Sequence, residues 1–399
     1  MPRFIAIPVA QGDAFYLERE GFSVLIDGGR SRSALPSMFQ AVTKTDGVNV
    51  ILCTHNDADH ANGLRGFLEA GLRCEEVWLP GRWLSVLPYI LRPFGEVFIE
   101  LVDNINETDS SSNMGAPQSS LSPIEAYAER VRGSLIDAPA TEEGPSVGED
   151  GWPETYLQML EQAEPWEDHP HWLGPWNRKD WYFWPYGHYR RLGPAGVQLL
   201  WSAINAADRI RAIATEAFHR GITVRWFEFD TATPSGGVSA LQPLNARAVA
   251  RVRPLVGSLL ALLALTVSNK ESLVFWSPPT ESNPGVLFTA DSDLAGLGLP
   301  SQLDRAIVTA PHHGSEANAN AYKAVQLAAP NGLASVTWVR SDGRYMSRPG
   351  RTYLTLPSRR LCTLCRRAGG TSTTKQPVHL YSRGGVWTRH RASRVCSCQ

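Results

Sequence analysis

The strongest constraint on this chain is a run of six residues, His55-Asn56-Asp57-Ala58-Asp59-His60, which follows an apolar stretch beginning at Val48. The apolar stretch predicts a buried strand, and side chains of an extended segment alternate between its two faces. His55, Asp57 and Asp59 are therefore predicted to point the same way, with His60 at the start of the next helix. Two nitrogen and two oxygen ligands suit zinc, manganese or iron, with one position left open. The alternative is a set of surface residues in a helix-capping turn.

Two later strands also end in residues that bind metals. The strand predicted at 286–289 leads into Asp291, and the apolar run 307–311 leads into His312 and His313. Taken singly, Asp291 also fits an ordinary turn, and the His pair fits the protein interior. Because strand ends meet at one edge of a sheet sandwich, the three segments together predict a metal centre at that edge.

Short apolar runs and helical patterns predict a mixed α/β fold. Strands are predicted at residues 4–9, 15–17, 23–26, 48–53 and 77–79, and helices at 34–42 and 63–70. After residue 195, regular structure is predicted to resume at 197–201, followed by a helix at 206–220 and strands at 223–229, 273–276 and 286–289.

The middle of the chain, residues 104–194, differs in composition and is interpreted as an insertion. It is Ser/Asn/Pro-rich at 110–123 and acidic at 137–154, with helices predicted near 124–134 and 156–163. Aromatic residues between 166 and 189, among them five Trp and Tyr189, offer stacking faces for bases or sugars. The commoner role of such residues is to pack a small core or a protein interface. We favour that role, which makes the insertion a candidate site for a protein partner.

Charge is concentrated at the C-terminal end. Residues 340–399 contain 13 Lys or Arg and one acidic residue, Asp342, although the whole chain has a net charge of −1. Such asymmetry favours a polyanionic partner, so nucleic acid is predicted, with DNA before RNA. A solvated basic tail, or an acidic protein partner, is the alternative.

No membrane role is expected. The longest apolar run, residues 255–267, is shorter than the roughly 20 residues of a membrane span, so a buried strand or helix is predicted there. The N-terminal residues lack the pattern of a secretory signal, and we expect a cytoplasmic protein.

Four cysteines in the predicted tail, residues 358–399, form the pairs Cys362-x-x-Cys365 and Cys396-x-Cys398. Two close pairs of thiols predict a structural zinc site. His379 or His390 can replace one thiol in that prediction, and free thiols or a redox pair remain alternatives.

The ordered motifs resemble the metallo-β-lactamase fold superfamily, and within it the branch of the ComEC competence-protein nuclease domain. The resemblance rests on Gln11–Ala14, Leu25–Gly29, Thr54–Gly63, Ser268–Val274, Leu287–Asp291 and Ala310–Ser315. Asp57 stands where the common signature has His, as in the ComEC-like branch. The resemblance implies a four-layer αβ/βα sandwich whose halves are residues 1–103 and 195–357.

The same resemblance implies a site with two divalent metal ions, zinc or manganese. His55 and Asp57 would bind one ion and Asp59 and His60 the other, and Asp291 would bridge them. His312 or His313 would complete the set of metal ligands, and Asp27 would accept a hydrogen bond that fixes the position of one ligand. The stretch before Asp291 lacks the His of ordinary two-metal members, so the second ion requires both His312 and His313.

The function predicted from these residues is metal-dependent hydrolysis of phosphodiester bonds, as in a nuclease. Asp59 is predicted to orient the attacking water or accept its proton. Arg348 stands where the branch has His, and it is predicted to stabilise developing negative charge alongside Asp291. Arg344 and Arg351 are predicted phosphate contacts.

Two alternatives stay open at this point. One is an inactive protein of the same fold that binds a partner. The other is a hydrolase of a small phosphodiester or lactone, with the insertion as a lid.

Overall fold

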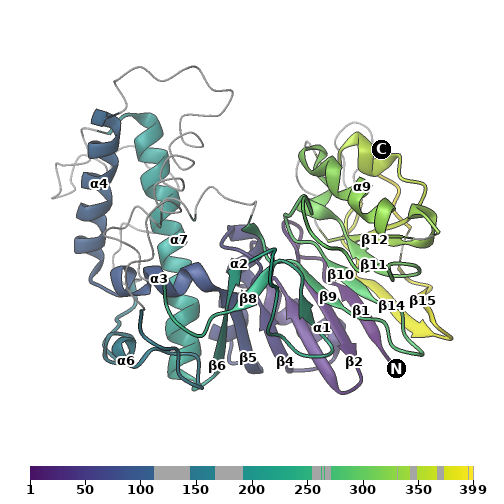
Figure 1. The fold of residues 1–399 in the computed structure, drawn as a ribbon, viewed down its shortest axis with the longest axis horizontal. Coiled ribbons are helices and arrows are strands. Elements are labelled where there is room, and N and C mark those ends of the chain that lie inside the picture. The colour runs from purple at the N-terminus through teal and green to yellow at the C-terminus, as the bar shows by residue number, and fades with distance from the viewer. Residues whose placement is uncertain are drawn as a thin grey trace. The chain divides into compact units, whose positions relative to one another are not determined.

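The computed structural model of the chain describes residues 1–111, 144–166, 192–253, 262, 265, 271–329, 331–341, 348–365, 373–393 and 395–398 (Figure 1). It divides into two compact units. The first unit comprises Met1–Gly81, Gly221–Val249 and Asn269–Gln399, and the second comprises Arg82–Arg220 and Ala250–Ser268. The helix predicted at 124–134, most of the aromatic stretch 166–189, most of the apolar run 255–267, and Arg344 lie outside the described residues.

The first unit contains a nine-stranded sheet with the order β15-β14-β1-β2-β3-β4-β5-β6-β8. Strands β3 to β6 are parallel to one another, and the remaining pairs are antiparallel. The bounds are β1 Arg3–Ala6, β2 Phe15–Arg19, β3 Phe22–Ile26, β4 Gly47–Leu52, β5 Arg73–Pro80, β6 Thr223–Phe229, β8 Ala246–Ala248, β14 Val378–Arg383 and β15 Val386–Arg389.

The second sheet of this unit has six strands in the order β13-β12-β11-β10-β9-β7, and Figure 1 shows β10, β11 and β12 side by side. Strands β10 to β13 are parallel. The bounds are β7 Gln242–Pro243, β9 Phe275–Ser277, β10 Val286–Phe288, β11 Ile307–Thr309, β12 Thr337–Arg340 and β13 Arg359–Cys362.

Alternation of side chains along the strands places one core between the sheets. Phe4 and Phe15 of the first sheet pack on Phe288 of the second, with ring centroids 6.1 and 6.4 Å apart. Offset aromatic pairs of this kind join the sheets more strongly than burial alone.

Helices cover the outer faces of both sheets. Tyr16, on the outer face of β2, packs edge-on against Phe39 of α1 (Ala34–Thr43), which also contacts Phe67 of α2 (Ala58–Glu69). On the second sheet, Trp338 packs against Tyr322 of α9 (Ala319–Ala328). The order helix, sheet, sheet, helix confirms the predicted αβ/βα sandwich. Three 3₁₀ turns and a short helix complete the described part of the unit: η5 Pro311–Gly314, η6 Glu316–Asn318, η7 Leu333–Ser335 and α10 Arg351–Leu354.

The C-terminal segment takes part in both sheets. Residues 359–362 form β13 at the edge of the six-stranded sheet, and β14 pairs along the whole of β1, with Arg3 opposite Tyr381 and Ala6 opposite Val378. Strand β1 is therefore an inner strand, held on both sides.

The second unit is helical in its described part. Its helices are α3 Gly81–Ile90, α4 Phe94–Ser111, α6 Glu154–Glu161 and α7 Pro194–His219, and α7 packs on α4 and α6. The helix predicted at 156–163 is confirmed as α6. Trp166 packs on Phe94 and under the guanidinium of Arg211, so this aromatic residue fills a local core, as favoured above.

The helix predicted at 206–220 begins earlier, because residues 197–201 already belong to the first turns of α7. A short apolar run does not distinguish a buried strand from a buried helix. The buried positions continue at Leu200, Ala203, Ile204 and Ala207, with the spacing of a helix. No helix in the described ranges is long and apolar enough to cross a membrane.

Candidate metal centre

Loops that follow parallel strands carry the predicted site residues. Asp27 follows β3, His55 follows β4, Asp291 follows β10, and the η5 turn with His312 and His313 follows β11. The carboxyl ends of parallel strands lie at one edge, so the fold brings residues together that are up to 286 positions apart.

Helix α2 begins earlier than predicted, at Ala58. Asp57 is the extended residue before it, with φ −63° and ψ 144°, and makes no side-chain capping bond. Asp59 therefore belongs to the first helical turn with His60, and the prediction that Asp59 continues the extended segment is wrong. Asp is a common residue just before a helix, which explains the early start.

Asp291 lies at the centre of four imidazole rings, and each ring turns its Nε2 toward this carboxylate. Oδ1 of Asp291 lies 3.3 Å from Nε2 of His60 and 3.8 Å from that of His313. Oδ2 lies 3.7 Å from Nε2 of His55 and 3.2 Å from that of His312. Each of the two carboxylate oxygens of Asp291 thus faces two imidazole rings.

Each of the four rings is held by a hydrogen bond at its other nitrogen. Nδ1 of His55 contacts Thr54 Oγ1 (2.9 Å), Nδ1 of His60 contacts Asp27 Oδ2 (2.8 Å), and Nδ1 of His313 contacts Asp13 Oδ1 (3.1 Å). Nδ1 of His312 contacts Asn318 Oδ1 at 3.0 Å. A hydrogen bond at Nδ1 orients the ring and directs the Nε2 lone pair outward, which is the usual arrangement of metal-binding histidines.

The donor set fits two cations. One group contains His55, Asp57 and Asp291, and the other contains Asp13, His60, Asp291 and His313, with ligand atoms within 4.8 Å of one another in each group. Nε2 of His55, Nε2 of His60 and Oδ2 of Asp13 are buried and make no hydrogen bond within the described part of the chain. Buried polar atoms are costly without a partner, and a cation would satisfy them.

Asp57 of the first group and Asp59, which belongs to neither group, are the more exposed carboxylates of the centre. Oδ2 of Asp59 lies 3.4 Å from Nε2 of His313, and Oδ2 of Asp57 lies 3.8 Å from Nε2 of His55. The Asp57 side chain is 35% exposed and that of Asp59 12%, whereas the Asp291 side chain is 2% exposed. Asp57 and Asp59 therefore mark the side of the centre that solvent reaches.

Asp13 is the site residue that sequence reasoning missed. The sequence shows it only in the turn Gln11–Ala14, with no strand end to point to a ligand. In the fold its Oδ1 also lies 3.0 Å from Ser341 Oγ, beside the contact to His313. Asp13 thus supports His313 as Asp27 supports His60.

The carboxylates and imidazoles of the centre shift one another's pKa values. Burial lowers the pKa of His60, but the carboxylates of Asp291 and Asp27 outweigh it and raise that pKa well above its usual value. Burial also lowers the pKa of His313, but the carboxylates of Asp13 and Asp291 outweigh it and raise that pKa to about 10. Burial raises the pKa of Asp291, and the facing histidines reverse this and hold it well below its usual value. Cations bound here would replace the protons of these imidazoles.

The backbone of the centre adopts unusual conformations. Asp27, Ala290, His312 and His313 have φ values of 56°, 46°, 47° and 57°. Left-handed conformations cost a non-glycine residue on the order of 1 kcal/mol each. Their concentration at the carboxyl ends of the strands indicates that the fold maintains this geometry at the expense of stability.

Arg348 reaches the centre, with Nη2 2.6 Å from Nε2 of His312. Burial lowers the pKa of His312, and the charge of Arg348 lowers it further. A neutral His312 accepts the hydrogen bond from Arg348 through Nε2. Arg351 begins α10 and is exposed.

Two sheets with helices on both outer faces, and His and Asp residues at their shared edge, define a metallo-β-lactamase-type sandwich. A family model of the metallo-beta-lactamase superfamily matches residues 7–71. The matched segment contains Asp13, Asp27 and the run His55–His60, so it supports the fold and the metal-dependent hydrolase class common in that superfamily. A search of the curated proteins finds no match.

Asp27→Asn is expected to weaken metal binding by about 10- to 100-fold, because Asp27 Oδ2 receives both Thr54 Oγ1–H and His60 Nδ1–H. An amide nitrogen in that place favours the tautomer of His60 with a proton on Nε2. Calorimetric titration with Zn²⁺ and Mn²⁺ measures the change. Asp46→Asn, at an exposed ion pair with Arg73, is the control. Equal affinity in a folded Asp27→Asn protein would contradict this role.

Proposed function

We propose that this protein hydrolyses phosphodiester bonds of nucleic acid, DNA before RNA, with two divalent cations held around Asp291. The observation that carries the proposal is the placement of four oriented Nε2 atoms, two on each oxygen of one buried carboxylate. This arrangement supports the bridging role of Asp291 that the ComEC-like resemblance implies. It also offers both His312 and His313, on opposite oxygens, to compensate for the His that the chain lacks before Asp291.

The proposed ligand sets follow from these distances. His55, Asp57, His312 and Oδ2 of Asp291 would hold one cation, and Asp59, His60, His313 and Oδ1 of Asp291 the other, with the buried Oδ2 of Asp13 beside this second set. Zinc and manganese both suit mixed His and carboxylate ligands. Such cations supply an activated water and positive charge for the phosphoryl oxygens.

The protein's own residues would then position the substrate and move protons. Asp59 lies on the solvent side of the centre, where its Oδ2 orients the attacking water and accepts its proton. Arg348 lies next to His312, where its fixed charge opposes the negative charge that develops on the phosphoryl oxygens.

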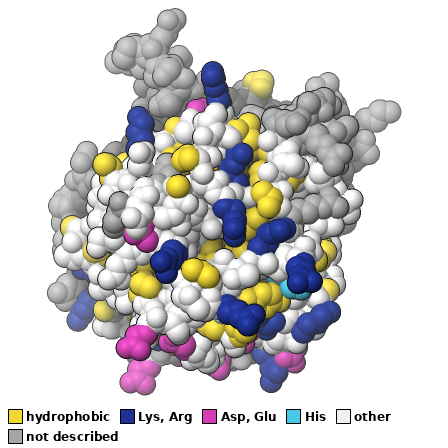
Figure 2. Space-filling model, turned by 90° about the vertical axis from the view of Figure 1, so that its right-hand side faces the viewer, with side chains coloured by type: hydrophobic (Ala, Val, Ile, Leu, Met, Phe, Trp, Pro, Cys, Tyr) yellow, Lys and Arg dark blue, Asp and Glu magenta, His cyan; other side chains and the backbone are white. Residues whose placement is uncertain are grey.

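Surface charge favours a polynucleotide over a small substrate. The face drawn in Figure 2 displays more Lys and Arg than acidic side chains, in line with the charge of residues 340–399. Arg351, at the exposed start of α10, is a proposed phosphate contact. Contacts of this kind give affinity without reading sequence.

The test uses the full-length protein with single- and double-stranded DNA, RNA, cyclic nucleotides and a lactone, each with Mn²⁺ or Zn²⁺. We expect cleavage of DNA that is abolished by a chelator and reduced at least about 100-fold in Asp59→Asn. Cleavage of only the small substrates would favour the alternative hydrolase. Stoichiometric metal without any cleavage, or cleavage equal in Asp59→Asn, would overturn the proposal.

Arg348→Gln is expected to separate catalysis from metal binding. Loss of the guanidinium removes stabilisation of the transition state, so kcat should fall about 100-fold at saturating metal. It also frees Nε2 of His312 and removes a repelling charge, so the cation on the His55 side should bind more tightly. Steady-state kinetics and metal titration measure the two effects. Arg351→Gln, three residues along the chain, should leave metal affinity unchanged. A parallel loss of metal and activity in Arg348→Gln would contradict this division of roles.

A further inference from the structure

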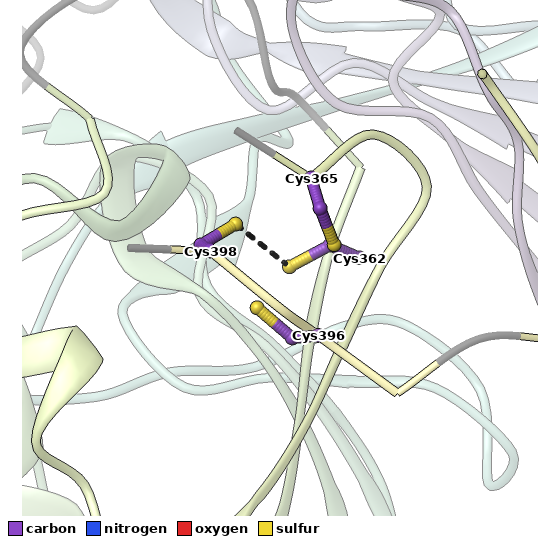
Figure 3. A group of neighbouring side chains, drawn as sticks. All are labelled: Cys362, Cys365, Cys396 and Cys398. Atoms are coloured by element: carbon purple, nitrogen blue, oxygen red, sulfur yellow. Dashed lines mark hydrogen bonds between the residues drawn. The ribbon is translucent and has the colours of Figure 1, made fainter. Parts of the chain in front are cut away.

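Four cysteines from two distant parts of the C-terminal segment lie together (Figure 3). Cys362 ends β13, Cys365 follows three residues later, and Cys396 and Cys398 come from the last residues described. All four Sγ atoms lie within 4.8 Å of one another, and three of the four side chains are buried. His379 and His390, the predicted substitutes for a thiol, are not part of this group.

The spacing of the sulfur atoms fits a metal better than disulfide bonds. None of the four cysteines forms a disulfide, and Sγ of Cys362 lies 4.0 Å from Sγ of Cys398. A disulfide joins sulfur atoms at about 2.05 Å. Four thiolates around a tetrahedral zinc at about 2.3 Å lie about 3.8 Å apart, close to the distance found here.

Backbone hydrogen bonds hold the two pairs in place. The N–H of Cys396 donates to the carbonyl of Arg360 at 2.8 Å, next to a bridge between Leu361 and Val395. The N–H of Ser397 donates to Sγ of Cys365 at 3.3 Å. An N–H donor stabilises the charged form of a sulfur that it contacts.

A buried positive charge lies against the cluster. Arg340, at the end of β12, is fully buried and donates to Sγ of Cys398 (3.2 Å) and to the carbonyl of Leu364 (3.3 Å). Within the described residues it forms no ion pair with a carboxylate. A buried guanidinium without a counter-charge is strongly unfavourable. Neutral thiols do not supply that counter-charge, whereas four thiolates around a divalent cation carry a net charge of −2.

We propose that Cys362, Cys365, Cys396 and Cys398 bind a structural zinc ion that fastens the C-terminal end of the chain to β13. Four thiolates fill the tetrahedral shell and leave no position for water, so this site is structural and separate from the centre around Asp291. Arg340 neutralises part of its charge, as partners outside the ligand set commonly do.

The zinc site also supports the Asp291 centre through neighbouring residues. Ser341, next to Arg340, donates to Gly12 O (2.8 Å) and contacts Asp13, which holds His313. Thr363, between the two cysteines of the first pair, donates to the carbonyl of Ser341. Removal of zinc is therefore expected to loosen Ser341 and Asp13.

Cobalt substitution tests the site in the full-length protein. Co²⁺ bound by thiolates shows intense sulfur-to-cobalt charge-transfer bands in the near ultraviolet, which His and Asp ligands do not give. We expect these bands in the wild type and in Cys74→Ser, a cysteine outside the cluster, and their loss in Cys362→Ser and Cys396→Ser. Metal analysis in an Asp291→Asn background should find one zinc per chain, lost when Cys362→Ser is added.

Two results would overturn the proposal. One is the absence of thiolate–cobalt bands in the wild type, which needs no variant to fold. The other is protection of the four cysteines from alkylation under denaturing conditions until a reductant is added, which would show disulfides. Because these measurements do not involve cleavage, they are independent of the proposed hydrolase activity.

Discussion

Asp291→Asn is expected to abolish binding of both active-centre cations and to lower phosphodiester cleavage by on the order of 10³-fold. Each oxygen of Asp291 faces two Nε2 atoms, so one carboxylate serves both proposed cations. An amide supplies one oxygen and no charge. Its nitrogen, placed opposite either pair of histidines, carries hydrogens where a cation requires a lone pair.

The measurement is metal content after dialysis, together with the melting temperature with and without added Zn²⁺ or Mn²⁺. A bound ligand raises the stability of the folded state, so the wild type should gain melting temperature with metal and Asp291→Asn should not. Asp293→Asn is the matched control, because this residue lies on the same loop and contacts only the N–H of Ala295 among the bonds found for it. Two tightly bound cations in Asp291→Asn, with the cysteine site accounted for, would contradict the bridging role.

The strands that precede the site residues were predictable, because each strand is a short apolar run. The runs before His55, Asp291 and His312 form β4, β10 and β11, and a polar residue directly after a buried strand is a strong local signal. The ligand types and their order along the chain were therefore readable from the sequence, and so was the αβ/βα fold that the resemblance implies.

Contacts between distant residues were not readable in this way. Asp13 supports His313 across 300 positions, and no local pattern of the turn Gln11–Ala14 predicts that partner. Pairing of β14 with β1 likewise joins the two ends of the chain, although the segment around β14 had the composition of a tail. Long-range pairing depends on the whole topology, whereas sequence periodicity reports only the local element.

Local ambiguity explains the remaining differences. Residues 197–201 form an apolar run whose type the sequence leaves open, and they belong to helix α7, which begins at Pro194, a residue favoured at the first helical position. Asp59 belongs to α2 because the helix starts directly after Asp57. In both segments the sequence indicates a helix but does not indicate the residue at which it begins.

Gly63→Ala is expected to destabilise the first unit by about 3 kcal/mol and to impair metal binding, because α2 crosses the loop after β3 at backbone contact. A Cβ on Gly63 would overlap the carbonyl oxygen of Gly28, and a Cβ on Gly28 would lie 2.6 Å from the carbonyl carbon of Gly63. Backbone atoms cannot rotate away as a side chain does. The N–H of Gly28 also donates to the carbonyl of His60 at 2.7 Å, so any displacement of α2 moves a proposed ligand.

The decisive observation is whether Gly63→Ala raises or lowers the free energy of unfolding. Inside a helix, Ala is favoured over Gly by about 1 kcal/mol, so helix propensity alone predicts that Gly63→Ala stabilises the protein. The close contact with Gly28 predicts that the same substitution destabilises the protein. Gly298→Ala is the control, since a Cβ there meets nothing within 4 Å. Urea unfolding with and without metal measures both variants. A stabilised Gly63→Ala protein with normal metal content would mean that α2 does not need this close approach to hold Asp59 and His60 against Asp27. A large loss in Gly63→Ala alone would identify the Gly28–Gly63 contact as the feature that fixes the helical half of the centre.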